Sequence, residues 1–312
     1  MRISFARIEE AARTIDPVFL GTPQYACEAL GDELGVDLVL KVETANPVRS
    51  FKGRGASYCV AGLEGDGPLV CASAGNFGQA MAYACRARRR PLIVYAGETA
   101  NALKVERMRA LGAEVRQAGA DFDAAKEAAR GYARDAGLRF VEDGLEAATA
   151  EGAGTIGLEM RSLRLDAVLV PLGNGALLAG VALALRTLAP AVKIVSVQAA
   201  GAPAMTESLR SCRVVRHEAM STIADGIGVR VPIPEALNDL AGIVDETLLV
   251  EEQSLVAAMR MIHRHAGLVV EPSGAAGVAA LLENTSYFLG RRAGTILCGG
   301  NLTAAQMREW LA

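Results

Sequence analysis

Aromatic residues are scarce in this chain of 312 residues: Phe, Trp and Tyr together make up only 4% of it, while hydrophobic residues make up 51%. A core with so few rings must be built mainly from Ala, Val, Leu and Ile side chains. The formal net charge is only −3. Both signs are spread along the chain without a long basic block, so the composition argues against nucleic acid as a partner.

Paired cysteines and long apolar runs are also missing. The six cysteines are scattered and form no C-x-x-C pair, which excludes the common zinc and redox motifs. No apolar run reaches membrane-spanning length, and residues 1–7 lack the apolar core of a secretion signal. We therefore expect a cytoplasmic protein that does not bind a membrane.

Short apolar runs alternate with Ala-rich helical patterns, which is typical of an α/β fold with parallel sheets and helices on both faces. The predicted strands are Leu38–Val42, Leu69–Ala72, Leu92–Ala96, Glu114–Gln117, Ala167–Pro171, Lys193–Gln198, Ile243–Val250 and Thr295–Cys298. The predicted helices are Gly78–Arg88, Ala102–Leu111, Ala120–Asp135, Gly154–Arg161, Ala176–Leu188, Glu251–His265 and Ser273–Leu282.

Four of the predicted strands lead into loops rich in Gly, Ser and Asn. These loops occupy residues 46–55, 72–76, 172–175 and 298–301. Ligands of open parallel sheets bind at the carboxyl ends of the strands. Four polar loops after four strands therefore predict one shared site.

The loop that starts at Gly173 opens an Ala- and Leu-rich helix, and such a helix N-terminus offers free N–H groups to a phosphate. A plain structural turn is the main alternative. A dinucleotide fingerprint fits poorly, because the third glycine comes too late and the next strand ends in Gln198 where an acidic residue is wanted.

Lys52 stands in the first polar loop, after Phe51 and before Gly53. A lone lysine is usually a surface residue. A lysine that forms a Schiff base needs partial desolvation, which lowers its pKa and frees the amine as a nucleophile. The neighbouring Phe51 would supply that desolvation, so Lys52 is a candidate nucleophile.

Taken together, these motifs resemble those of the pyridoxal-phosphate enzymes of the tryptophan-synthase β type (fold type II), and within them the serine/threonine dehydratases. The resemblance extends from Gly21 to Asn301. Its motifs, in chain order, are residues 50–56 (SFKGRGA), 73–79 (SAGNFGQ), 173–177 (GNGAL), 222–227 (TIADGI), 271–274 (EPSG) and 298–301 (CGGN).

The resemblance implies a role for each motif. Lys52 would carry pyridoxal phosphate as a Schiff base and act as the acid and base at Cα, Phe51 would lie against the cofactor ring, and Asn76 would bind the ring's 3-hydroxyl. The phosphate would be held by Gly173, Asn174, Gly175, Ala176 and Leu177. The substrate carboxylate would be held by Ser73, Ala74, Gly75, Asn76 and Phe77. The family has more consecutive glycines in the phosphate loop, so Asn174 and Ala176 fit only if neither needs a positive φ.

Two residues bear on the type of reaction. Cys298 would face the pyridine nitrogen, and such a neutral partner makes the ring a weaker electron sink, which favours loss of a β-substituent over transamination. Related serine racemases have a second serine at the position of Ala74, where it serves as acid and base. Ala74 cannot move a proton, so elimination is favoured over racemisation.

Two departures from the family also matter. Phe77 replaces a histidine or small residue and would narrow the pocket or stack on an aromatic substrate. Gln198 replaces a glutamate that cation-dependent members use, so we expect no metal site. The chain ends soon after Asn301, and no C-terminal regulatory domain is expected.

We therefore predict a two-domain α/β enzyme of fold type II, with residues 1–49 plus 149–312 as the large domain and residues 50–148 as a small inserted domain. Its cofactor, pyridoxal 5'-phosphate, would lie in the cleft between them. The predicted activity is an ammonia-lyase that converts a small hydroxy-amino acid, such as L-threonine or L-serine, to a 2-oxo acid and ammonia. The alternatives are a threonine-synthase-like or β-replacement enzyme and a catalytically weak cofactor-binding protein. A homodimer is expected from the resemblance alone.

Overall fold

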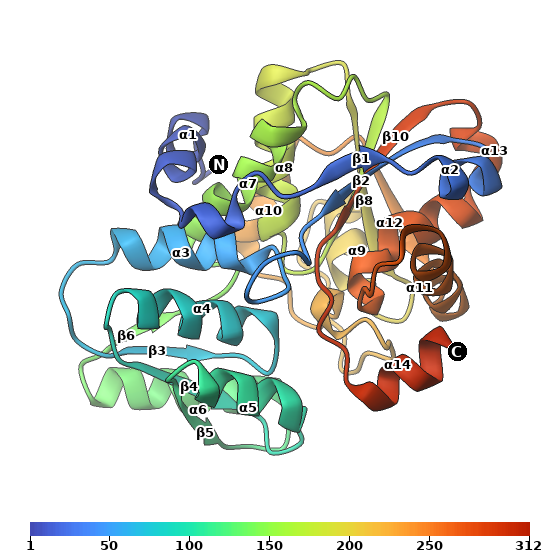
Figure 1. Ribbon diagram of the computed structural model, residues 1–312. Coiled ribbons are helices and arrows are strands. Elements are labelled where there is room, and N and C mark those ends of the chain that lie inside the picture. The colour runs from blue at the N-terminus through green and yellow to red at the C-terminus, as the bar shows by residue number, and fades with distance from the viewer.

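Two separate sheets organise the chain in the computed structural model, which describes residues 1–312 (Figure 1). The larger sheet has six strands in the order β1-β2-β10-β7-β8-β9, and the smaller has four in the order β5-β4-β3-β6. All neighbouring strands pair in parallel except β1, which runs antiparallel to β2. The strands are β1 (Gln24–Ala26), β2 (Asp37–Val42), β3 (Leu69–Ala72), β4 (Leu92–Ala96), β5 (Glu114–Gln117), β6 (Arg139–Val141), β7 (Ala167–Pro171), β8 (Lys193–Ala199), β9 (Glu246–Val250) and β10 (Arg292–Leu297).

Helices cover both faces of each sheet, as the alternation of patterns predicts. The α-helices are α1 (Phe5–Thr14), α2 (Glu28–Leu34), α3 (Lys52–Gly62), α4 (Asn76–Ala87), α5 (Ala102–Ala110), α6 (Phe122–Asp135), α7 (Ala147–Met160), α8 (Ala176–Leu188), α9 (Ala204–Ser211), α10 (Pro234–Leu240), α11 (Glu252–Ala266), α12 (Pro272–Glu283), α13 (Thr285–Phe288) and α14 (Ala304–Leu311). Two 3-10 turns, η1 (Pro17–Phe19) and η2 (Asp225–Ile227), complete the chain.

Strand β2 shows how the six-stranded sheet is buried on both faces. Leu38 and Leu40 join the core that includes residues of α2, α11 and α12, while Val39 joins the core formed with α7 and α8. Alternate side chains of a strand point to opposite faces, so an uninterrupted apolar run is what a doubly covered sheet requires. The predicted α/β fold with two open parallel-sheet units is thus confirmed, with β1 as its antiparallel exception.

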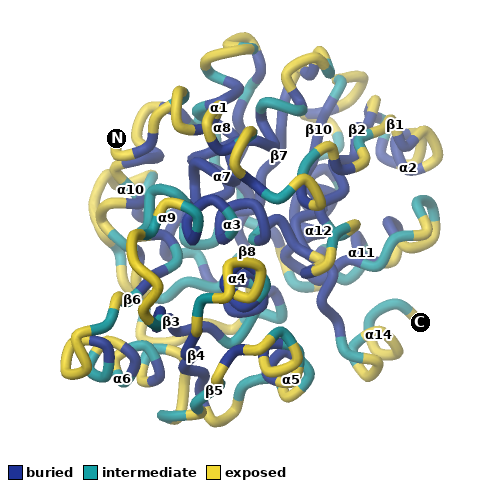
Figure 2. Tube along the Cα trace, turned by 60° about the vertical axis from the view of Figure 1, so that its left-hand side comes forward, coloured by how far each residue is buried: buried dark blue, intermediate teal, exposed yellow.

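The four-stranded sheet is packed in the same way on a smaller scale. Met81 of α4 and Met108 of α5 belong to the core on one face, and Ala129 and Ala133 of α6 belong to the core on the other. Figure 2 shows the outer turns of α5 and α6 exposed, while the central strands β3 and β4 are buried. Every strand of this sheet lies inside residues 50–148. The predicted domain boundaries themselves stay a prediction.

The sequence patterns missed several elements, including the ten-residue α1 and others that are short or contain glycine. Strands β1 and β6 have only three residues each, and α3 contains Gly53 and Gly55, which weaken a helical pattern. Packing explains both glycines. A Cβ on Gly53 would lie 2.2 Å from the Phe19 ring, and one on Gly55 would lie 2.5 Å from the carbonyl oxygen of Thr149. Lys52, predicted to lie in a loop, is therefore the first residue of a helix.

None of the helices combines the length and the apolarity needed to cross a bilayer.

Candidate active site

The predicted loops meet at a cavity of about 670 Å³. They follow strands of the two lobes that Figure 1 shows. The cavity walls include residues from each of the four polar loops: Phe51, Lys52, Ser73, Ala74, Gly75, Asn76, Phe77, Asn174 and Cys298. A volume of this size is typical of a pocket for a cofactor or small ligand. The other four residues of the predicted phosphate loop, Gly173, Gly175, Ala176 and Leu177, do not form part of the cavity wall.

Lys52 lies at the start of α3 with only 14% of its side chain exposed. Its Nζ is 4.9 Å from the centre of the Phe51 ring and 6.0 Å from that of Phe77, so both rings help to remove it from solvent. The Nζ donates to Oδ2 of Asp143 at 2.5 Å. The desolvation predicted for this lysine is thus present, together with a carboxylate that the sequence patterns did not indicate.

Asn76, the first residue of α4, is held by side chains from the other lobe. Its Nδ2 donates to Oε1 of Glu271 at 2.6 Å, and its Oδ1 accepts from Nδ2 of Asn301 at 2.8 Å. The backbone N–H of Asn301 also donates to Oε2 of Glu271. One N–H of the Asn76 amide therefore stays free to donate into the cavity.

Glu271 is buried at the centre of this arrangement. Burial, together with the nearby charge of Asp225, raises the pKa of Glu271 to about 7, although Lys104 and the hydrogen bonds from Asn301 and Asn76 act in the opposite direction. A carboxyl group that titrates near neutral pH inside a cavity is a common feature of functional sites.

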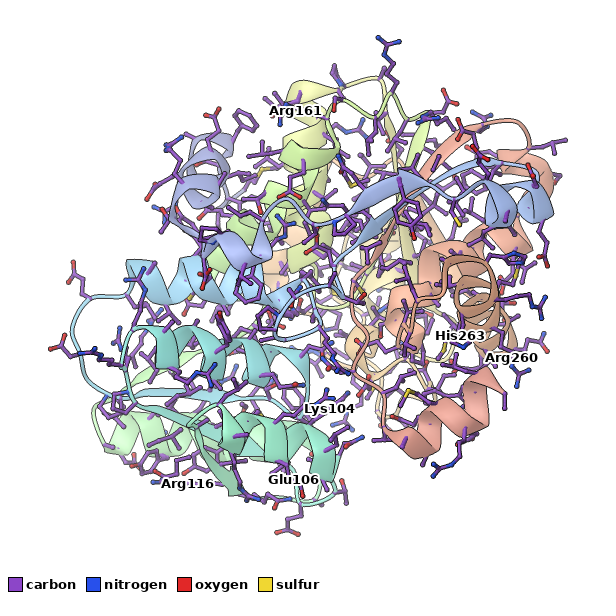
Figure 3. All side chains as sticks on the ribbon, in the orientation of Figure 1. Lys104, Glu106, Arg116, Arg161, Arg260 and His263 are labelled. Carbon is purple, nitrogen blue, oxygen red and sulfur yellow. The ribbon has the colours of Figure 1, made fainter.

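Lys104 of α5 provides the second cation near the Ser73–Phe77 loop. Its Nζ donates to Oδ2 of Asp225 at 2.5 Å, and it lies 3.9 Å from where a Cβ on Gly75 would be. Figure 3 shows Lys104 on the side of α5 toward the other lobe, while Glu106 of the same helix lies on the outer side. The Lys104–Asp225 ion pair thus joins the two lobes across the cavity.

The Ser73–Phe77 loop is shaped by its own first side chain. Oγ of Ser73 accepts hydrogen bonds from the backbone N–H groups of Gly75 at 3.1 Å and of Gly78 at 2.9 Å. With both acceptor positions used, the hydroxyl hydrogen is free to donate to a ligand. The loop therefore offers an anion a hydroxyl donor at the N-terminus of α4.

The loop before α8 meets the condition stated for Asn174 and Ala176, that neither residue needs a positive φ. Gly175 is the N-cap of α8 with a φ of 99°, whereas neither Asn174 nor Ala176 has a positive φ. The one position of this loop with a positive φ is therefore occupied by a glycine. The Asn174 side chain also bends over the helix start, where its Oδ1 accepts from the Ala176 N–H at 3.4 Å.

Two further groups line the cavity near the ends of the large sheet. Cys298 follows β10, and burial raises the pKa of its thiol, so the group is neutral at physiological pH. Oγ of Ser273 is buried without a hydrogen-bond partner in the protein. Both are neutral polar groups suited to the heteroatoms of a bound ring.

The sequence patterns missed Asp143 and gave no role to Glu271, Lys104 or Asp225. Asp225 and Glu271 lie inside the family motifs at residues 222–227 and 271–274, so their place near the site could be foreseen. Asp143 follows β6, a strand too short to be predicted, and no local signal marks it.

Comparison with known proteins places the chain in a family. The model of a family described as pyridoxal-phosphate dependent enzyme matches residues 15–299. The chain belongs to this family. It is 35% identical to the L-threonine ammonia-lyase of Thermotoga maritima, over 96% of this chain and 76% of that one.

Solved structures of the same kind have the same fold. The processed form of threonine deaminase isoform 2 from Solanum lycopersicum superposes with a TM-score of 0.92 at 29% identity, covering 98% of this chain and 86% of that one. The serine racemase of maize gives a TM-score of 0.92 at 26% identity, covering 99% and 97%. The predicted resemblance to fold type II enzymes and the dependence on pyridoxal phosphate are therefore confirmed.

The residues present also fit the cofactor. A partly desolvated lysine, a free amide N–H on Asn76, a neutral thiol and a glycine-capped helix all lie at or beside one cavity. These are the kinds of group that an aldehyde, a ring hydroxyl, a pyridine nitrogen and a phosphate require. No group of three or more His, Cys, Asp or Glu side chains is placed to hold a metal ion.

Proposed function

We propose that this pyridoxal-phosphate dependent enzyme is an ammonia-lyase of hydroxy-amino acids, with L-threonine and L-serine as its substrates. The observation that carries the proposal is Lys52, a partly buried amine that shares one cavity with the anion-binding loop Ser73–Phe77. The similarity to proteins named L-threonine ammonia-lyase and threonine deaminase supports the same reaction.

The cofactor would be held by Lys52 at its aldehyde carbon and by Phe51 against its ring. The free N–H of Asn76 would donate to the ring's 3-oxygen, and the Cys298 thiol would face the ring nitrogen. The phosphate would be bound at the start of α8 by residues 173–177. When bound, pyridoxal phosphate stabilises the negative charge that develops at the substrate Cα.

The protein's own residues would position the substrate and move its proton. Ser73 would donate its free hydroxyl hydrogen to the substrate carboxylate, and the N–H groups at the start of α4 would complete that contact. Lys104, beside Gly75, adds positive charge near the same carboxylate. Lys52 would then remove the proton from Cα, since its amine is the basic group in reach of the reacting atoms.

Ala74 supports elimination over racemisation. Racemisation needs a second proton donor on the opposite face of Cα, and an alanine methyl group cannot supply one. The maize protein named serine racemase has the same fold, so the fold alone does not distinguish elimination from racemisation. The residue at position 74 supplies that distinction.

The test is release of 2-oxo acid and ammonia from L-serine and L-threonine by the purified protein loaded with pyridoxal phosphate. Chiral analysis of the remaining serine measures racemisation in the same tubes. We expect turnover of at least one substrate with little D-serine, and no turnover by a Lys52→Ala variant. Wild-type protein that holds the cofactor but releases no 2-oxo acid from any hydroxy-amino acid would contradict the proposal.

The homodimer and the cytoplasmic location stay predictions from the sequence. Sedimentation of the purified protein tests the first.

A further inference from the structure

Asp143 is the one carboxylate in direct contact with the reactive lysine. Its Oδ2 lies 2.5 Å from Nζ of Lys52, although the two residues are 91 positions apart in the chain. Its other oxygen, Oδ1, is buried and accepts no hydrogen bond from the protein. The Asp143 side chain is 19% exposed and belongs to the wall of the cavity.

Two other carboxylates of the same cavity have cationic partners other than Lys52. Glu142 pairs with Arg130 at 2.5 Å, and Asp225 pairs with Lys104 at 2.5 Å. Asp143 makes its single ion pair with Lys52. The partner of Asp143 is therefore the group whose charge must change during the reaction.

The consequence follows from the chemistry of the lysine and rests on the proposed function. When Lys52 is bonded to the cofactor, it is no longer a free ammonium group, and Asp143 must find another hydrogen-bond donor. A partly buried carboxylate without a donor is costly, so a donor on the substrate is favoured beside it. The β-hydroxyl of serine or threonine is such a donor.

We propose that Asp143 is a further catalytic residue that protonates the departing β-oxygen of the substrate. Lys52, displaced by the substrate, takes the proton from Cα, and the electron pair of the Cα–H bond becomes the Cα–Cβ double bond. The Cβ–O bond breaks with its electron pair on oxygen. The proton moves from Nζ to Oδ2 of Asp143, which lies within hydrogen-bond distance, and from Asp143 to that oxygen, so water leaves and both side chains return to their first states.

The test compares leaving groups that do and do not need a proton. An Asp143→Asn variant keeps the shape of the side chain but cannot relay a proton. We expect its kcat/KM for L-serine to fall about 10²-fold or more, the usual worth of a positioned acid. With β-chloro-L-alanine, whose chloride leaves without a proton, the fall should stay within about 10-fold. An Asp143→Glu variant keeps a carboxylate and should recover part of the turnover of L-serine.

The affinity for the cofactor distinguishes a catalytic role of Asp143 from a structural one. Absorbance titration of cofactor-free protein with pyridoxal phosphate should give an affinity for Asp143→Asn within about 10-fold of wild type. A Glu142→Gln variant is the matched control, because it removes the neighbouring carboxylate, which faces Arg130. Its ratio of activity on L-serine to activity on β-chloro-L-alanine should equal that of wild type.

Equal losses on both substrates in Asp143→Asn, or no loss on L-serine, would overturn the role of Asp143. These results leave the proposed function intact, because the wild-type protein still turns over L-serine. Wild-type protein that released no 2-oxo acid from any hydroxy-amino acid or from β-chloro-L-alanine would overturn both proposals.

Discussion

Arg54 stands two residues after Lys52 and holds α3 against the large sheet through a buried cluster of charges. Its side chain is fully buried and makes paired contacts of 2.8 Å with Glu43, which is also fully buried. It donates further to Glu159 at 2.6 Å and to Oγ1 of Thr155 at 2.9 Å. Lys41, the second cation of the cluster, donates to Glu159 at 2.5 Å.

The prediction is that Arg54→Met destabilises the fold by about 3–5 kcal/mol, the usual cost of removing one partner from a buried ion pair. Methionine fills much of the same space but leaves the Glu43 carboxylate buried with Oγ1 of Thr22 as its remaining side-chain donor. Burial alone would raise the pKa of Glu159, but hydrogen bonds and charge from Arg54 and Lys41 hold it below its ordinary value. The network therefore stabilises the ionised carboxylate of Glu159 in the folded state.

The assay is urea unfolding of the cofactor-free protein followed by circular dichroism, so that cofactor binding does not enter the free energy of unfolding. A double variant, Arg54→Met with Glu43→Met, removes both partners of the buried pair and should be at least about 1 kcal/mol more stable than Arg54→Met alone. Arg134→Met is the control, because Arg134 and Asp135 form an exposed pair, and it should cost less than about 1 kcal/mol. A cost below about 1 kcal/mol for Arg54→Met, or a double variant less stable than the single one, would refute the reasoning.

Three further predictions test the packing, the electrostatics and the thiols. Gly180→Ala should destabilise the fold by about 2 kcal/mol or more in urea unfolding, since its Cβ would lie 2.0 Å from the Ala150 carbonyl oxygen. Gly131→Ala on α6, whose Cβ would meet only Nη2 of Arg134 at an ordinary 3.9 Å, should stabilise it by about 0.5–1 kcal/mol. Burial, with the charge of Asp225, raises the pKa of Glu271 to about 7, so the folded protein keeps a proton that the unfolded chain releases near its ordinary value of 4.5. The contribution of Glu271 to stability should therefore fall by on the order of 3 kcal/mol as the pH rises from 4.5 to 7. The free energy of unfolding should decrease more, or increase less, over this range in wild type than in Glu271→Gln; equal slopes for the two proteins would contradict the prediction. A thiol reagent should modify one cysteine, Cys212, rapidly in the native protein and all six after unfolding, because the other five are buried; rapid reaction of a second thiol would contradict the burial.

The sequence predicted those elements and loops whose signal lies in neighbouring residues. The predicted strands match eight of the ten observed ones. The signal is clearest in strands such as β3 (LVCA) and β4 (LIVYA), because a strand covered on both faces shows its burial in consecutive apolar residues. Three of the four polar loops follow β2, β7 and β10 of the six-stranded sheet, whose parallel strands bring their carboxyl ends to the same edge. The fourth follows β3 of the four-stranded sheet, and all four contribute to the wall of one cavity. The positions of Lys52, Asn76 and Cys298 could therefore be foreseen without coordinates.

Elements without a local signal were missed. Helix α3 has an unfavourable composition, with Gly53 and Gly55 in its first turns, and forms because those glycines allow close contact with Phe19 and Thr149. Strand β6 is held by pairing with β3, which lies about 70 residues earlier in the chain. Neither contact is visible in a window of neighbouring residues.

The sequence by itself determined the fold class, the motif order that marks a pyridoxal-phosphate dependent enzyme, and the choice of Lys52 as the lysine proposed to hold the cofactor. Only the tertiary structure decided which charges meet: Asp143 with Lys52, Lys104 with Asp225, and Glu43 and Glu159 with Arg54. The physical reason is one of range. Periodicity reports on side chains a few residues apart, whereas an ion pair depends on a distance of a few ångströms between groups that the folded backbone brings together.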